Sequence, residues 1–292
     1  MQTFLPEFAA QRIVVPFKLQ LLKWIGNKQR FANEITSFFP DNFRTYHEPF
    51  LGSGAVLGTL RPDIGFASDV FKPLMEIWST LHDRPDRLKQ WYRERWNRME
   101  SSEKNEVYEE IKASYNTSPN GADLLFLCRS CYGGVVRFRK ADGYMSTPCG
   151  VHHPISPDAF SHRVDLWRIR TKNVTFRIAD FREAMSEAKK GDLIYCDPPY
   201  NDSQTILYGA QEFRLNQLFS TIENCRRKGV YVALSIDGRK ESGRKACFID
   251  IPQGLFVRDL SVNCGPSMLK RFQMEGKTLE KHYVSDRLLL TY

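Results

Sequence analysis

Membrane spans, a secretion signal and a disulfide framework are all missing from the sequence. No apolar run approaches the roughly 20 residues that a membrane-spanning helix needs. The N-terminus lacks a basic segment followed by an apolar stretch and a small-residue cleavage site, so we do not expect secretion. The seven cysteines, an odd number scattered from Cys128 to Cys264, look like reduced thiols. We therefore expect a cytoplasmic protein.

The composition is that of a globular protein with an excess of positive charge. The chain is 42% hydrophobic and 26% charged. Its 292 residues are enough for one large domain or for a domain with an insertion. The formal charge is +8, and the pI is near 9.1. This excess favours a polyanionic partner such as a nucleic acid, although many unrelated proteins are equally basic.

Strands and helices alternate at both ends of the chain. Short apolar runs are typical of strands that are covered on both faces, and apolar residues at helical spacing follow two of them. This order predicts right-handed crossovers and a mainly parallel sheet in an α/β fold. The predicted strands are Thr45–Glu48, Ile64–Ser68, Leu193–Cys196 and Val230–Ser235, and helices are predicted to begin at Ala55 and Leu215.

The middle of the chain differs from both ends. Residues 81–115 are charged and helical in pattern, and residues 133–157 are rich in glycine, proline, arginine and histidine with little periodicity. We interpret residues 75–165 as an insertion into the α/β domain, whose two parts are then residues 1–74 and 166–292.

A glycine-rich turn follows the first predicted strand. Phe50, Gly52 and Gly54 belong to a turn that would let the backbone approach a ligand at the start of a helix. Asp69 ends the next predicted strand, where an acidic residue commonly accepts ribose hydroxyls. The full dinucleotide fingerprint is missing, which argues against NAD. A tight strand-to-helix turn without a ligand is the alternative interpretation.

An acid, two prolines and an aromatic residue follow the buried run 193–196. Asp197 and the carbonyl of Pro198 could accept hydrogen bonds from the exocyclic amino group of a planar base, while Tyr200 stacks on that base. The prolines would fix the loop and remove competing N–H donors. The alternative is a rigid turn at the strand exit with a capping aspartate.

Taken together, these motifs resemble the Dam-like DNA adenine-N6 methyltransferases, a group of amino methyltransferases with an Asp-Pro-Pro-Tyr motif. The resemblance covers about residues 21–292 and keeps the family's order of donor site, recognition segment and catalytic motif. Segments 129–137 and 143–150 resemble the family's DNA-reading segment. The matching motifs are Lys23 to Lys28, Glu48 to Val56, Ser68 to Val70 and Cys196 to Tyr200.

The resemblance implies a methyl donor and a fold. It implies a Rossmann-like S-adenosylmethionine-dependent methyltransferase fold with an inserted, mostly helical target-recognition domain at 75–165. Residues 1–74 would form the donor-binding part and residues 166–292 the catalytic part. S-adenosyl-L-methionine would be the donor, and no metal is expected. The implied donor-binding residues are Trp24, Lys28, Phe50, Gly52, Gly54, Asp69 and Asp197.

The implied reaction is methyl transfer to N6 of an adenine in double-stranded DNA. The base must be flipped out of the duplex, where Asp197, Pro198 and Tyr200 would hold it. The resemblance also implies that the enzyme is the modification partner of a restriction endonuclease. A cytosine-N4 or RNA amino methyltransferase, or an inactive DNA-binding relative, is the alternative. Cytosine-N4 enzymes usually carry serine at the position of Asp197, which disfavours them.

Recognition of DNA is assigned to the inserted region. Positions matching Tyr132, Arg137 and Pro148 would contact bases, and Arg137 is the expected reader of guanine. Family members that methylate GATC have asparagine where this chain has Gly133, so the target sequence stays open. Phosphate contacts are expected from Arg129, Arg139 and Lys140.

One feature of the same region resembles a fragment of a zinc site. Cys128 and Cys131 have a Cys-x-x-Cys spacing, and His152 and His153 follow. Because the two cysteines fall in a predicted helix and the matching family segment holds no metal, we do not expect zinc here.

Overall fold

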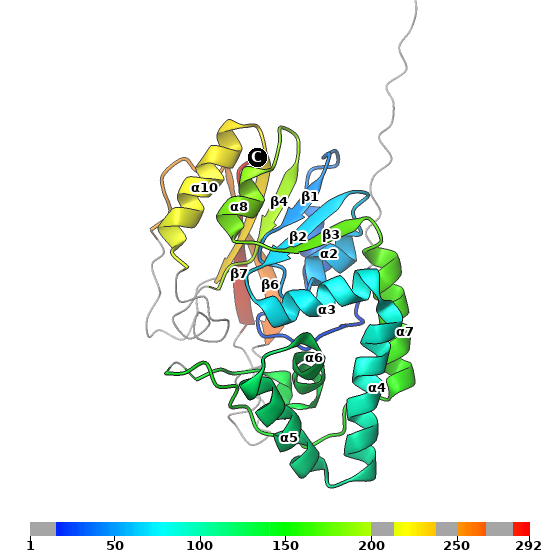
Figure 1. The fold of residues 1–292 in the computed structure, drawn as a ribbon. Helices are drawn as coiled ribbons and strands as arrows, with labels where there is room; N and C mark the ends of the chain where they lie inside the picture. Colours follow the sequence, from blue (N-terminus) through cyan, green and yellow to red (C-terminus); the bar gives the residue numbers. More distant parts are fainter. Residues whose placement is uncertain (1–15, 140, 200–212, 238–249, 267–282) are drawn as a thin grey trace, which may run out of the picture.

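The computed structural model describes residues 16–139, 141–199, 213–237, 250–266 and 283–292. Within these residues the centre is a seven-stranded sheet with the strand order β3-β2-β1-β4-β5-β7-β6 (Figure 1). The strands are β1 (Tyr46–Glu48), β2 (Gly65–Asp69), β3 (Val174–Ile178), β4 (Leu193–Cys196), β5 (Tyr231–Asp237), β6 (Arg258–Pro266) and β7 (Tyr283–Leu290).

The mainly parallel α/β sheet predicted from the sequence is confirmed. Strands β3, β2, β1, β4 and β5 run parallel to one another, and β7 lies antiparallel between β5 and β6. The sequence did not reveal β3. Since β3 is an edge strand and only Val174 within it is fully buried, it lacks the continuous apolar run that marks the central strands.

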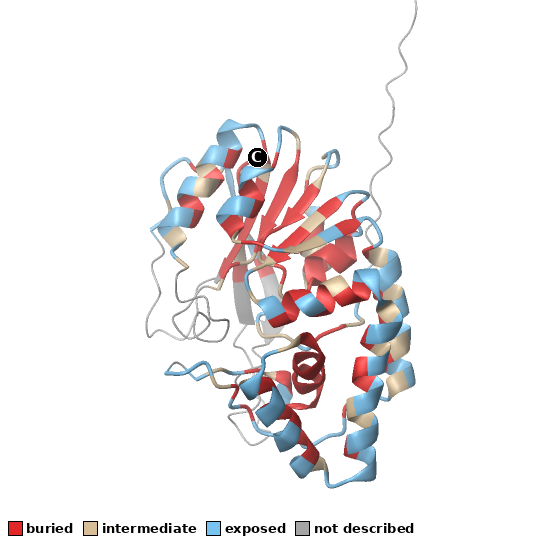
Figure 2. Ribbon diagram, viewed as in Figure 1, coloured by how far each residue is buried: buried red, intermediate tan, exposed pale blue. Residues whose placement is uncertain are grey.

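Apolar side chains cover both faces of the sheet. Alternation along β4 sends Leu193 and Tyr195 into one apolar cluster and Ile194 and Cys196 into another. The first cluster includes residues of α2 (Ala55–Leu60) and α3 (Lys72–Asp83), and the second includes residues of α8 (Phe181–Ser186) and α10 (Leu215–Arg227). Figure 2 accordingly shows β1 and β4 as buried along their whole length.

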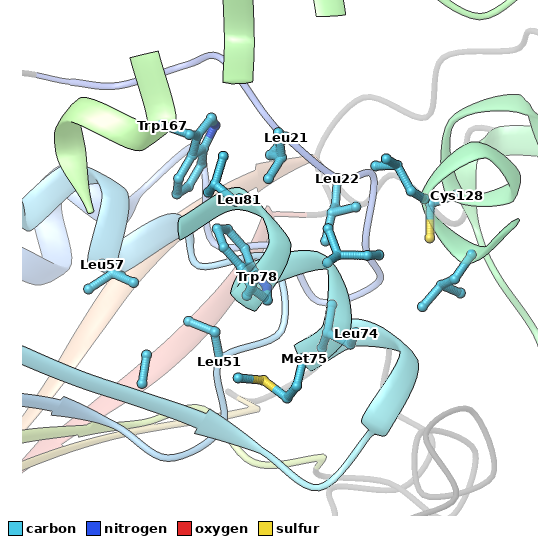
Figure 3. Packing of buried hydrophobic residues seen from close by; sticks show 14 of the residues in the cluster. Leu21, Leu22, Leu51, Leu57, Leu74, Met75, Trp78, Leu81, Cys128 and Trp167 are labelled. Atoms are coloured by element: carbon cyan, nitrogen blue, oxygen red, sulfur yellow. The ribbon is translucent and has the colours of Figure 1, made fainter. Parts of the chain in front are cut away.

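A tryptophan pair anchors the glycine turn to the core (Figure 3). The fully buried Trp78 ring stacks on Phe176 with a centroid distance of 5.5 Å, and Trp167 meets Trp78 edge-on at 5.2 Å. The Trp78 Nε1–H also donates a hydrogen bond to the carbonyl oxygen of Gly52 at 3.1 Å. The packing of α3 therefore fixes the backbone of the loop that follows β1.

Between β2 and β3 the chain forms a mostly helical part beside the sheet (Figure 1). The buried helix α6 forms its centre, and the buried Asp123 in α6 is paired with Arg95 at 2.6 Å. None of the described helices is both long and apolar enough to cross a membrane. The elements here are α4 (Pro85–Ser101), α5 (Lys104–Thr117), α6 (Gly121–Ser130), the short η1 (Tyr132–Gly134) and α7 (Pro157–Arg170).

The expected limits of the insertion fall inside two helices. Residue 75 lies in α3, which contacts β2 and β3, and residue 165 lies in α7, which contacts both α3 and α4. Both helices therefore connect the sheet to the helical part. Before β1, the chain also forms a short helix α1 (Ala32–Ser37), which packs on α2.

Candidate active site

A cavity of about 240 Å³ opens where β1, β2 and β4 end. The carboxyl ends of parallel strands are the usual position for a ligand in an open α/β sheet. The walls come from the segment before α1, the loop after β1, the end of β2, the three residues that follow β4, and the starts of α8 and α10. Predicted donor-site residues that line it are Trp24, Lys28, Phe50, Gly52, Asp69 and Asp197.

The glycine turn needs glycine for two separate reasons. Gly52 and Gly54 have φ values of 50° and 63°, in the left-handed region that residues with a Cβ atom rarely adopt. A Cβ at Gly52 would lie 3.3 Å from the Trp24 ring, and one at Gly54 would lie 2.9 Å from the Trp78 ring. The bare backbone of this turn therefore allows both tryptophans to approach. Gly54 itself serves this packing and does not line the cavity.

Asp69 stands beside the turn, as the sequence spacing predicts. Its Oδ2 accepts a hydrogen bond from the Gly52 N–H at 3.3 Å, and its Oδ1 accepts one from the Phe71 N–H at 3.0 Å. Burial raises the pKa of the carboxyl, while these N–H groups act in the opposite direction. Asp69 thus ties the end of β2 to the glycine turn at the wall of the cavity.

Lys28 and Asp197 form a direct ion pair. The Lys28 Nζ lies 2.8 Å from Asp197 Oδ1, and the two side chains are only 6% and 18% exposed. A second carboxylate, Asp286 Oδ2 in β7, lies 3.6 Å from the same ammonium, and the carbonyl oxygen of Gly26 accepts a hydrogen bond from it at 3.2 Å. Lys28 is therefore held between two acids, one directly after β4 and one in β7. Asp286 was not identified as a site residue from the sequence.

Another acid in this region was also missed. Glu48 is 3% exposed at the end of β1, lines the cavity and accepts a hydrogen bond from the Tyr46 hydroxyl at 2.6 Å. Desolvation raises the pKa of Glu48 to about 8, and the negative charge of Asp197 acts in the same direction. An acid inside an otherwise buried strand was the available sequence signal.

Three phenylalanines form a further part of the cavity wall. The Phe50 ring stacks on Phe181 at a centroid distance of 5.3 Å, and Phe213 lies 5.8 Å from each of them. Asp180 and Arg182, which flank Phe181 at the start of α8, line the cavity as well. Sequence reasoning missed this segment because it follows the unpredicted strand β3. The cavity can therefore accept a ligand with an aromatic part at one side and a positive charge near the acids.

The expected base-contacting residues lie together on the surface of the helical part. The Tyr132 N–H donates a hydrogen bond to the Pro148 carbonyl at 2.9 Å. Isolated antiparallel β-bridges pair the backbone of Cys131 with that of Cys149, and the backbone of Phe138 with that of Met145. Tyr132, Arg137 and Pro148 are exposed, and Arg139 is exposed beside Asp142. We name residues 131–150 the recognition segment.

The prediction that Arg129 binds DNA phosphate is wrong. Arg129 is only 4% exposed in α6, and its guanidinium donates to the carbonyl oxygens of Gln20 and Leu21. It therefore anchors the chain that leads into the donor site. Two other expected site residues, Tyr200 and Lys140, lie outside the described residues.

The cysteines of the zinc-like pattern lie in different surroundings from the histidines. Cys128 and Cys131 are buried at the end of α6, and burial raises the pKa of both thiols. His152 and His153 are exposed in the segment that leads to α7.

Comparison with known proteins gives a consistent family description. The sequence model of the D12 class N6 adenine-specific DNA methyltransferases matches residues 24–251. A DNA adenine methylase of Vibrio cholerae is 27% identical over 231 residues, which are 73% of this chain and 79% of the relative. A type II methyltransferase of Lactococcus lactis is 24% identical over 232 residues, with the same coverage. A DNA N-6-adenine-methyltransferase of Escherichia phage P1 is 25% identical over 234 residues, which are 76% of this chain and 30% of the relative.

Proposed function

The chain belongs to the D12 class of N6 adenine-specific DNA methyltransferases, and from that premise we propose which residues bind the donor, activate the adenine and read the DNA. The observation that carries the proposal is the buried Lys28–Asp197 ion pair, which stands beside the glycine turn in one cavity. The two motifs that sequence reasoning assigned to donor and base thus share a single site.

The cavity fits S-adenosyl-L-methionine, which supplies a methyl group carried on a positively charged sulfonium. Trp24 and the bare backbone at Gly52 form a surface for a flat or cationic group, and Asp69 offers an acceptor for ribose hydroxyls. The formal charges of Asp197, Asp286 and Lys28 sum to −1, which favours a positive group next to them. Lys28 would attract the donor's carboxylate, with Phe50 packing on the donor from the other side.

Asp197 has the central chemical role in this proposal. The adenine amino group is a poor nucleophile because its lone pair is delocalised into the ring. If Asp197 and the Pro198 carbonyl accepted hydrogen bonds from its two hydrogens, the lone pair would be localised on N6 and would be available to the methyl group that the donor supplies. Positioning and electrostatic stabilisation then provide most of the acceleration. Tyr200 would stack on the flipped base.

The recognition segment would contact the duplex. The proximity of Tyr132 and Pro148, with Arg137 exposed on the same segment, supports base contacts from these three residues. Arg139 would contact phosphate, since its guanidinium is half-exposed. We further propose that the protein acts in the bacterial cytoplasm as the modification partner of a restriction endonuclease.

Sequencing of modified bases tests this function. The protein is expressed in a bacterial host that lacks DNA adenine methylation, and genomic DNA is read for modified bases. We expect N6-methyladenine within one short sequence context, at nearly every copy of that context. Methylation of cytosine N4, methylation of RNA only, or no modified base from folded protein would each contradict the proposal.

The restriction partner requires a separate experiment. Purified DNA from the expressing host is challenged with endonucleases of known specificity that cut at the methylated context. Protection from cleavage is expected for a modification enzyme. Complete cleavage at sites that carry the methyl group would contradict this part of the proposal and leave the methyl transfer itself intact.

A further inference from the structure

We propose that Asp286, in the last strand of the sheet, is a positioning residue for methyl transfer, because it holds the Lys28 ammonium while Asp197 engages the adenine. This inference rests on the proposed function. It adds a residue that lies outside the glycine turn, the Asp-Pro-Pro-Tyr motif and the recognition segment.

Strand register brings Asp286 to the correct face of the sheet. The Tyr195 hydroxyl and Ser235 Oγ lie 2.9 Å apart, so β4 and β5 present these two side chains on one face. Ser235 is paired with Leu288 across the antiparallel β5–β7 ladder. Side chains two residues apart in a strand share a face, so Asp286 points to the same side as Leu288 and Tyr195.

The distances describe a shared ammonium. Lys28 Nζ lies 2.8 Å from Asp197 Oδ1 and 3.6 Å from Asp286 Oδ2. The side chains of Lys28 and Asp286 are 6% and 11% exposed, so water screens their attraction weakly. The closer contact belongs to Asp197, and Asp286 stands as the second partner.

The chemistry gives such a second partner in the protein a role. In the proposed reaction, Asp197 must accept a hydrogen bond from the adenine amino group, and this bond competes with its contact to Lys28. Breaking a buried ion pair is costly, because the ammonium has already lost its water shell. With Asp286 in place, the ammonium remains paired when Asp197 turns to the base. Without Asp286, the attraction between Lys28 and Asp197 would oppose the hydrogen bond between Asp197 and the adenine amino group.

The test compares two aspartates of neighbouring strands. Asp286→Asn removes the charge and keeps the shape, whereas Asp259→Asn removes an acid of β6 that is 51% exposed and paired with Arg287. Single-turnover methyl transfer to duplex DNA is measured at saturating donor. We expect Asp286→Asn to lower the rate by roughly 10- to 100-fold, with duplex affinity unchanged, and Asp259→Asn to match the wild type.

A conservative variant separates positioning from a merely structural role. Asp286→Glu keeps the charge on a longer arm, and we expect it to recover at least half of the logarithmic loss in rate. If the asparagine variant does not fold, as judged by its unfolding temperature, Asp286→Ser replaces it. A neutral variant with the wild-type rate, a glutamate variant no better than the asparagine one, or neutral variants that all fail to fold would overturn the proposal.

The outcomes also distinguish this inference from the proposed function. If wild type and Asp259→Asn both methylate adenine while Asp286→Asn equals them, only the role of Asp286 fails. If folded wild type transfers no methyl group to DNA, the proposed function fails first.

Discussion

The donor cavity and the recognition segment use charged residues in opposite ways. At the cavity, Lys28, Asp197 and Asp286 are mostly buried and paired with one another. On the recognition segment, Arg137 and Arg139 lie at the surface, where a polyanion can reach them. We propose that this basic chain divides its charge between two tasks. The buried charge would order the proposed reaction site, and the exposed charge would contact DNA.

Two arginines that are eight residues apart, Arg129 and Arg137, show the same contrast between buried and exposed charge. Arg129 is buried and donates to the backbone of residues 20 and 21, whereas Arg137 is exposed. The family resemblance predicts a DNA contact for both arginines. However, Arg129 lies in the buried last turn of α6, whereas the exposed Arg137 lies in the loop that follows. Four experiments test this division, beginning with the largest expected effect.

Lys28→Met should damage the cavity most. It removes the ammonium that pairs with two mostly buried carboxylates, so we expect the free energy of unfolding to fall by about 3 kcal/mol. Methyl transfer should fall by about 10²–10³-fold because Asp197 is no longer oriented. The matched control is Lys89→Met, which breaks a more exposed pair with Asp165 and should cost about 1 kcal/mol or less. Equal losses in urea unfolding would contradict the comparison.

Arg129→Ala and Arg137→Ala should separate stability from recognition. Arg129→Ala removes the Arg129 donor from the buried Leu21 carbonyl oxygen, whereas the Gln20 carbonyl oxygen keeps its hydrogen bond from Arg163 at 2.8 Å, so the free energy of unfolding should fall by about 1–3 kcal/mol. Arg137→Ala should leave stability unchanged and weaken discrimination between target and altered duplexes by about 1–3 kcal/mol. Denaturation and competition binding measure the two quantities. Our division fails if Arg137→Ala is the destabilised variant.

Glu48→Gln should change the pH dependence of stability. The pKa of Glu48 in the folded protein is raised from 4.5 to about 8, so the folded state holds this proton more tightly than the unfolded state. Its contribution to stability is complete below pH 4.5 and is lost as the pH rises towards 8. Between pH 6 and 9, the donor-free wild type should therefore lose more unfolding free energy than the glutamine variant. Parallel losses would contradict the burial argument.

Arg139→Ala should have the smallest effect. Its guanidinium pairs with Asp142 and lies 4.2 Å from the centroid of the Tyr144 ring, both near the surface. We expect binding to weaken a few-fold on every duplex alike, and the slope of log affinity against log salt to fall by about 1. A change in sequence preference would instead assign base reading to Arg139.

Local patterns made much of this molecule predictable. The buried runs predicted β1, β2, β4 and β5, and the glycine turn and Asp69 meet as their spacing indicates. Both features depend on residues that are close in sequence, or on strand ends that a parallel sheet aligns. The family resemblance added the order of the motifs and identified the reaction.

The remaining features depend on partners that are distant in sequence. β3 escaped prediction because an edge strand needs no continuous apolar run. The pairing of Lys28 with Asp286 joins the start of the chain to its last strand, which no local pattern encodes. The burial of Arg129 had a signal, because the apolar run Leu124–Cys128 predicts a helix that is buried on all sides.

Single-turnover methyl transfer by Asp197→Ala tests the central claim most directly. The substrate is duplex DNA that contains the target context, and Asp259→Ala serves as the control acid outside the cavity. Our account predicts that Asp197→Ala loses at least about 10³-fold in rate, since one positioned group of an active site contributes this much. Its affinity for duplex DNA should stay within about threefold of the wild type, because phosphate and base contacts lie elsewhere. A folded Asp197→Ala variant that transfers methyl groups at the wild-type rate would contradict the mechanism.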